Sequence, residues 1–108
     1  MRVLFDNSTP RGVTRGLRDH TVTEARGLGW DRLKNGELLK AAEEASFEVF
    51  VTADQNIRYQ QNLTQRKIAL VVLGNGRWTI VKRHIAEIAS AIDAATLGSY
   101  HHVDMENR

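Results

Sequence analysis

Short apolar runs alternate with longer amphipathic stretches along the chain. The apolar runs have the length of strands, and we predict strands at residues 2–6, 21–25, 48–52, 68–73 and 98–103. The run IALVVL at 68–73 is apolar at every position, which is typical of a central parallel strand buried on both faces. The pattern therefore indicates a mostly parallel sheet.

Helices are predicted in the intervals between these strands. Thr9 and Pro10 have the residue types of an N-cap and a first helical position, so we expect a helix that begins there and ends near His20. Apolar residues at helical spacing predict two further helices, at residues 36–46 and 79–96.

The alternation of strands and helices decides the expected fold class. Residues 55–65 are polar and predict a helix or a turn. A predicted helix or turn therefore lies between each predicted strand and the next strand along the chain. We expect an α/β fold, a three-layer α/β/α sandwich with a mostly parallel central sheet and right-handed crossovers. The 108 residues, 42% of them hydrophobic, suit a single domain over residues 1–108 with one buried core.

Composition restricts the possible chemistry. The chain has no cysteine, so a disulfide framework and a thiolate metal site are excluded, and a metal would bind oxygen or imidazole. The first residues, MRVLFDN, carry charge, and no apolar run approaches the roughly 20 residues of a membrane span. We therefore expect a cytoplasmic protein with no membrane association.

Charge is distributed unevenly, although the net charge is only +2. Residues 55–86 contain six basic residues and no acid, whereas residues 37–54 contain five acids and one lysine. An acidic centre beside a basic flank suits a metal together with a polyanion. Ordinary clustering on a solvated surface explains the same pattern, because 26% charged residues is an average content.

Two aspartates follow predicted strands, Asp6 after the first and Asp54 after the third. Ligands of open parallel sheets bind beyond the carboxyl ends of the strands, where these side chains are expected. Two neighbouring carboxylates need a cation between them, and oxygen ligands favour Mg²⁺ or Mn²⁺. With Glu37 as a third oxygen ligand, the set predicts metal-dependent phosphodiester hydrolysis. The structural alternative is that Asp6 and Asp54 cap turns or helix starts, and that the helix dipole favours Glu37 in the first turn of its helix.

Basic side chains are candidates for contacts with RNA phosphates. We select five of them: Arg11, Arg15, Arg58, Lys82 and Arg83. Tyr59 or Trp78 would stack on bases, although surface basic residues need no function and aromatic residues at helix edges usually pack.

Two further patterns favour structural roles. The sequence Gly-Asn-Gly at 74–76 lacks the third glycine of a dinucleotide-binding fingerprint and predicts a plain turn. His101 and His102 with Asp104 suggest a metal site, but adjacent residues of a strand point to opposite faces. A polar tail explains these residues better.

Three stretches of the chain resemble a known family. FDNSTPRG (5–12), NGELLKAAE (35–43) and FVTADQNI (50–57) are similar to the three signature blocks of small PIN-like proteins. That family is related to the PIN-domain toxin ribonucleases of bacterial toxin–antitoxin modules, and the resemblance spans most of residues 2–74.

The resemblance implies a function and a set of site residues. Asp6, Glu37 and Asp54 match the family's metal-binding and catalytic carboxylates. A protein of this kind would be a Mg²⁺- or Mn²⁺-dependent endoribonuclease. It would act as the toxin of a toxin–antitoxin module, bind an antitoxin protein and form a homodimer.

Four neutral residues lie at other positions of the same blocks. Thr52 matches the threonine of the third block, while Asn7, Asn35 and Asn56 stand where the family usually has acids. These side chains are candidate neutral ligands, or hydrogen-bond partners of the ligands. Each asparagine removes a negative charge and should weaken metal binding. The alternative is therefore a degenerate PIN-like domain that binds RNA or a partner protein without catalysis.

A signalling receiver domain is a further alternative. Receivers also place acids after the first strand and a phosphorylatable aspartate after the third, as Asp6 and Asp54 are placed here. The details disagree, because position 7 is not acidic, no Met-Pro follows Asp54, and no lysine-proline pair ends a late strand.

Overall fold

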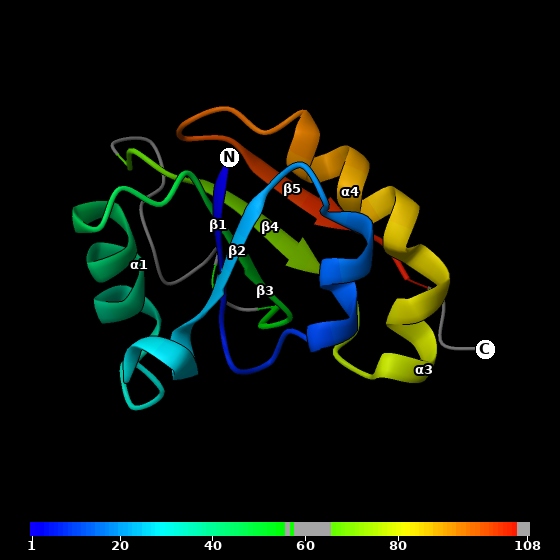
Figure 1. Ribbon diagram of the computed structural model, residues 1–108, viewed down its shortest axis with the longest axis horizontal. Helices are drawn as coiled ribbons and strands as arrows, with labels where there is room; N and C mark the ends of the chain where they lie inside the picture. The colour runs from blue at the N-terminus through cyan, green and yellow to red at the C-terminus, as the bar shows by residue number, and fades with distance from the viewer. Residues whose placement is uncertain (56, 58–65, 106–108) are drawn as a thin grey trace.

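The computed structural model describes residues 1–55, 57 and 66–105. Within these residues five strands form a single sheet in which every neighbouring pair is parallel, in the order β2-β1-β3-β4-β5 (Figure 1). The strands are β1 (Arg2–Phe5), β2 (Thr21–Glu24), β3 (Val49–Thr52), β4 (Ala69–Leu73) and β5 (Tyr100–Val103). All five predicted strands are confirmed, and β4 is buried along its whole length, as its apolar run predicted.

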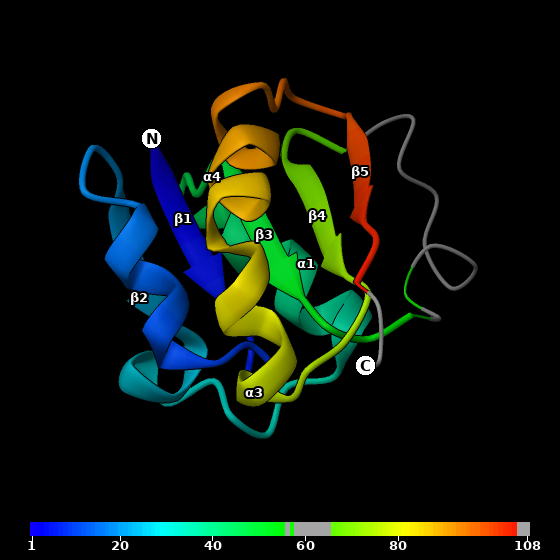
Figure 2. The same ribbon diagram turned by 90° about the vertical axis from the view of Figure 1, so that its right-hand side faces the viewer.

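Helical segments cover both faces of the sheet (Figures 1 and 2). The segments are η1 (Arg11–Gly16), η2 (Ala25–Leu28), α1 (Asn35–Glu44), α3 (Trp78–Val81), η3 (Lys82–His84) and α4 (Ile85–Asp93), where η marks a 3-10 helix. α1 packs on one face, and η1 with α4 packs on the other. The expected α/β fold with three layers is therefore confirmed at this level. None of the helices in the described ranges is long and apolar enough to cross a membrane.

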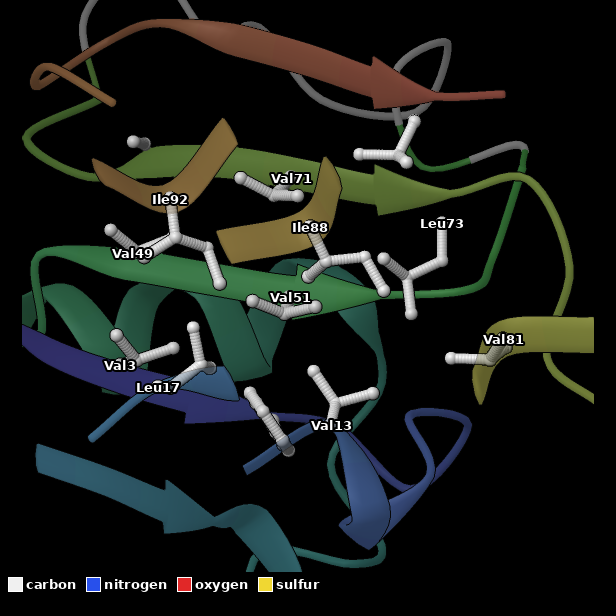
Figure 3. Close-up of a cluster of buried hydrophobic side chains, with 13 residues drawn as sticks. Val3, Val13, Leu17, Val49, Val51, Val71, Leu73, Val81, Ile88 and Ile92 are labelled. Carbon is white, nitrogen blue, oxygen red and sulfur yellow. The ribbon is translucent and has the colours of Figure 1, made fainter. Parts of the chain in front are cut away.

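The core divides into two clusters because successive strand residues point to opposite faces of the sheet. Val3 and Phe5 of β1 join the cluster under η1 and α4, whereas Leu4 joins the cluster under α1. Figure 3 shows the first cluster, where Ile88 and Ile92 of α4 lie over the valines of the central strands. Each fully buried aliphatic side chain of this kind contributes about 1.5–3 kcal/mol to folding.

The predicted first helix differs in type and length from the observed one. η1 is a 3-10 helix that ends at Gly16, not an α-helix that continues to His20. The N-cap position is held by Pro10, whose side chain has no acceptor for a cap. The Oγ1 of Thr9 lies 2.9 Å from the carbonyl oxygen of Val51 and 3.0 Å from Oδ1 of Asp6. The predicted N-cap role of Thr9 is therefore wrong.

Close packing explains the composition of η1. A Cβ atom at Gly12 would overlap the ring of Trp78, and one at Gly16 would overlap the side chain of Ile85. The two glycines thus allow η1 to lie directly against α3 and α4. They also weaken an α-helix, because glycine loses more backbone entropy on ordering than other residues do.

The predicted helix 79–96 is observed as three shorter pieces, α3, η3 and α4. η3 ends at His84, whose backbone (φ −120°, ψ 15°) leaves the helical region directly before α4 begins. Ile88 and Ile92 are fully buried as the apolar stripe predicted, but Ile85 is only partly buried. Of the predicted helix or turn at residues 55–65, only Gln55 and Ile57 lie within the described part of the chain.

The helix predicted at 36–46 is confirmed as α1, and it ends in a left-handed turn. Ser46 has a φ of 65°. Its N–H donates to the carbonyl oxygen of Glu43 (3.0 Å), and the N–H of Phe47 donates to that of Ala42 (2.9 Å). These two bonds form a Schellman motif, in which glycine is the usual residue at the position of Ser46.

Candidate functional site

The strand order places the candidate site at the β1–β3 boundary. Chain connections run in opposite directions from β1 and β3, and doubly wound sheets of this order bind ligands beyond the carboxyl ends of these two strands. Phe5 of β1 pairs with Val51 of β3, and the N–H of Asp6 donates to the carbonyl oxygen of Val51 (3.2 Å). Asp6 therefore leaves the sheet beside the end of β3.

The carboxylate of Asp6 accepts hydrogen bonds from four donors. Oδ1 accepts from the Ser8 N–H (3.1 Å) and the Ser8 hydroxyl (2.7 Å), and it shares the single proton of the Thr9 hydroxyl (3.0 Å) with the carbonyl oxygen of Val51. Oδ2 accepts from the hydroxyl of Thr52. An ionised carboxylate offers about four acceptor positions, so protein donors occupy much of its capacity. Oδ2 accepts only one of these bonds and therefore retains an acceptor position.

Thr52 connects the two predicted strand exits. Its side chain is fully buried, and its hydroxyl donates to Asp6 and accepts from the backbone N–H of Asp54 (3.0 Å). The same oxygen lies 3.3 Å from the hydroxyl of Ser8. Asp6 and the half-buried Asp54 are thus joined through one buried hydroxyl. Of the predicted carboxylate ligands, Thr52 bonds the side chain of Asp6 and the backbone of Asp54.

Ser8 and Thr9 are site residues that sequence reasoning missed. The Ser8 hydroxyl, besides its bond to Asp6, accepts from the N–H of Ala53 (2.9 Å), and so binds the exits of β1 and β3 together. A signal for this role was present, because hydroxyl residues two and three positions after an aspartate form Asx-type turns.

Glu37 has the contacts of a helix-capping residue. Its exposed carboxylate accepts from the backbone N–H of Lys34 (3.3 Å) at the start of α1. α1 begins at the carboxyl edge of the sheet, where the side-chain amide of Asn7 donates to the carbonyl oxygen of Asp31 (3.1 Å). Asn7 therefore ties the loop before α1 to the end of β1. The side chain of Asn35 lies outside what the structure describes.

The predicted metal ligands are near one edge of the sheet but are not gathered into one cluster. Across residues 1–55, 57 and 66–105, no group of three or more histidines and carboxylates is placed to hold a metal ion. Asn56, the last predicted neutral ligand, lies outside the described residues. Asp6 with the Thr52–Asp54 segment is therefore the part of the predicted site that the structure brings together.

A second hydrogen-bonded group extends along the same edge. The side-chain amide of Gln55 donates to the carbonyl oxygens of Ala53 (3.0 Å) and Leu73, which fixes its oxygen toward Nε2 of His102 (2.7 Å). Nδ1 of His102 lies 2.9 Å from the carboxylate of Asp104. Both ring nitrogens thus face acceptors, and these contacts explain His102 without a metal.

Four of the five basic residues predicted for RNA contacts lie in one layer of the molecule. Arg11 and Arg15 lie on η1, and Lys82 and Arg83 lie on η3, in the layer where η1 packs beside α3 and α4 (Figure 2). Arg11 pairs with Glu24 (3.0 Å), and the guanidinium of Arg15 lies 5.6 Å from the ring centre of Trp78. Arg58 and Tyr59 lie outside the described residues.

The loop after β4 lies against the candidate site. A Cβ atom at Gly76 would come within 3.3 Å of the Cβ of Ala53 and 3.4 Å of the carbonyl oxygen of Ser8. The side chain of Asn75 accepts from the N–H of Arg77 (2.8 Å) and holds the loop in a turn. The chain bends at Gly74, and Gly76 permits the close approach to the site.

Strand order alone does not separate the competing functions. Signalling receivers share the order observed here. However, Asp104 and Met105 follow β5, and among the described strands none is followed directly by a lysine. The observed strand order is thus compatible with a receiver domain, but no described strand is followed by the lysine that a receiver has. A search of protein-family models, curated proteins and solved structures finds no match to this chain.

Proposed function

We propose that the protein is a Mg²⁺- or Mn²⁺-dependent endoribonuclease of the PIN type, with Asp6 and Asp54 as metal ligands and Glu37 as a third acid at the same edge. The observation that carries the proposal is the link between the exits of β1 and β3. The Thr52 hydroxyl binds the carboxylate of Asp6 and the backbone of Asp54 together, at the point where sheets of this order bind ligands.

The donor set fits a hard divalent cation. Carboxylate oxygens are available and thiolates are absent from the chain, which favours Mg²⁺ or Mn²⁺. When bound, such an ion lowers the pKa of a coordinated water and offsets the charge of a phosphoryl group. Ser8, Thr9 and Thr52 orient the carboxylate of Asp6, and its Oδ2 accepts from the hydroxyl that also binds the backbone N–H of Asp54.

The toxin role and the partners belong to the same proposal. As the toxin of a toxin–antitoxin module, the protein would be held inactive by an antitoxin protein and would form a homodimer. The family resemblance of the three sequence blocks supports this part, and the fold is compatible with it.

The second candidate is a domain that binds RNA or a partner protein without catalysis. Two observations favour it. Asp6 already accepts four hydrogen bonds, and Glu37 caps α1, which are structural roles for two of the three acids. The asparagines at positions 7, 35 and 56 also leave less negative charge for a cation than the family pattern would.

Cleavage of a mixed RNA pool tests the two candidates. Wild-type protein is incubated with Mn²⁺ or Mg²⁺ beside Asp6→Asn and Asp54→Asn, with Asp19→Asn as a matched control at the opposite edge of the sheet, before β2. We expect both site variants to lose cleavage by at least about 100-fold, because a metal ion supplies several kcal/mol of charge stabilisation. The control should retain it. Absence of metal-dependent cleavage by folded wild type would refute the enzymatic proposal and leave the binding role.

A further inference from the structure

Arg77 occupies a fixed backbone position beside the candidate site. Its N–H donates to the side chain of Asn75, and the preceding residue, Gly76, packs against Ala53 and Ser8. Ser8 binds the carboxylate of Asp6, and Ala53 lies between Thr52 and Asp54. Arg77 therefore directly follows the residue that packs against the exits of β1 and β3.

The guanidinium of Arg77 differs from those of the neighbouring arginines. Arg11 pairs with Glu24, and Arg15 lies over the ring of Trp78. The Arg77 side chain is exposed, and no hydrogen bond, ion pair or ring contact engages it in the part of the chain that the structure describes. It is a basic group on the loop that lies against the acidic site, and its donors are available to a ligand.

A polyanionic substrate needs such a group at this place. The carboxylates of Asp6 and Asp54 repel the phosphates of a nucleic acid, and a cation beside them offsets that repulsion. A guanidinium also presents two parallel N–H donors that match two phosphate oxygens, which an ammonium group does not.

We propose that Arg77 binds a backbone phosphate of a single-stranded RNA, next to the phosphate held at the Asp6–Asp54 site. The inference rests on the proposed nucleic-acid substrate and names the residue that holds it. In this proposal the RNA strand continues from Arg77 across the surface of η1 and η3, which carry Arg15 and Lys82.

Binding under conditions that prevent cleavage tests this inference. A short fluorescein-labelled single-stranded RNA is titrated with protein in EDTA and, in a second series, with Ca²⁺ in place of Mg²⁺ and Mn²⁺, and anisotropy gives the dissociation constant over a range of salt concentrations. The proteins are wild type, Arg77→Gln, Arg77→Lys and the matched control Arg18→Gln, whose exposed arginine lies at the amino edge of the sheet. Unlabelled RNA of the same sequence and inorganic phosphate serve as competitors.

Loss of one phosphate contact should lower the slope of log affinity against log salt by about 0.7 in Arg77→Gln. We expect its affinity to fall several-fold, that of Arg77→Lys to fall less with the slope kept, and that of Arg18→Gln to remain. Stronger competition by unlabelled RNA than by inorganic phosphate supports an RNA strand as the ligand. Equal slopes and affinities for wild type and Arg77→Gln, stronger competition by phosphate, or no RNA binding by wild type would each overturn the inference.

This outcome is separate from the outcome of the cleavage test. RNA binding that depends on Arg77, without metal-dependent cleavage, refutes the enzymatic proposal and supports the phosphate contact. Cleavage that is indifferent to Arg77→Gln, with unchanged binding, refutes the contact and leaves the enzymatic proposal intact.

Discussion

Thr52→Val isolates the contribution of the buried hydroxyl that joins the two strand exits. Valine has nearly the same shape as threonine, so the substitution removes one hydroxyl from a fully buried position and leaves the packing in place. The carboxylate of Asp6 loses one donor, and the N–H of Asp54 loses its acceptor. The effect on stability therefore reports the hydrogen bonds and not the apolar contacts.

The magnitude follows from the types of bond that are lost. A hydrogen bond to a charged group is worth about 1.5–3 kcal/mol, and an unsatisfied backbone donor costs about 1 kcal/mol or more when it is buried. Because Asp54 is only half-buried, water replaces part of the lost acceptor. We expect the free energy of unfolding to fall by about 2–3 kcal/mol in Thr52→Val.

Urea unfolding followed by circular dichroism measures this change. With a denaturant slope of about 1.5 kcal/mol per molar, the midpoint should fall by between about 1 and 2 M. Thr52→Ser is the matched variant, because it keeps the hydroxyl and removes a buried methyl group, at a cost of about 1 kcal/mol. If Thr52→Val unfolds at the same urea concentration as wild type, or is more stable than Thr52→Ser, the hydroxyl does not hold the strand exits together.

Three further substitutions test other contacts. Ser46→Gly should raise the free energy of unfolding by about 0.5–1 kcal/mol, because glycine has no Cβ to strain the left-handed turn; an unchanged urea midpoint would contradict this. Gly12→Ala should lower it by about 1–3 kcal/mol, since the new methyl displaces the ring of Trp78, and a shift in tryptophan fluorescence should accompany the loss. Glu37→Gln should change the free energy of unfolding by less than about 1 kcal/mol and still reduce metal-dependent cleavage; unchanged cleavage would leave Glu37 a helix cap alone.

Much of the fold was predictable because the deciding signals are local. The continuous apolar run of β4 required burial on both faces, and the helical spacing in α1 required one covered face. The first helix was predicted incorrectly for a non-local reason. Thr9 has the residue type of an N-cap, but its hydroxyl lies beside the carbonyl oxygen of Val51, 42 residues away in the chain. The sequence around Thr9 does not include that partner, so a local pattern could not predict this contact.

The candidate site was predictable only in outline. Acids after two strands indicated an edge of the sheet, and Asp6 does leave the sheet beside the end of β3. The hydroxyls of Ser8 and Thr52 could not be assigned to Asp6 without the register that pairs Phe5 with Val51. Register between parallel strands is set by packing over the whole sheet, which is why composition and spacing do not show it.

The all-parallel sheet also determines when the site exists during folding. Parallel neighbours cannot be joined by a tight hairpin, and Val3 must find Val49 across most of the first half of the chain. Closing such loops lowers the entropy of the chain before any contact between the strands stabilises it. Folding is therefore slow compared with that of helical proteins of this size. Asp6 and Thr52 meet only after that closure. The nascent chain therefore has no partial site before β3 has been synthesised and has docked beside β1.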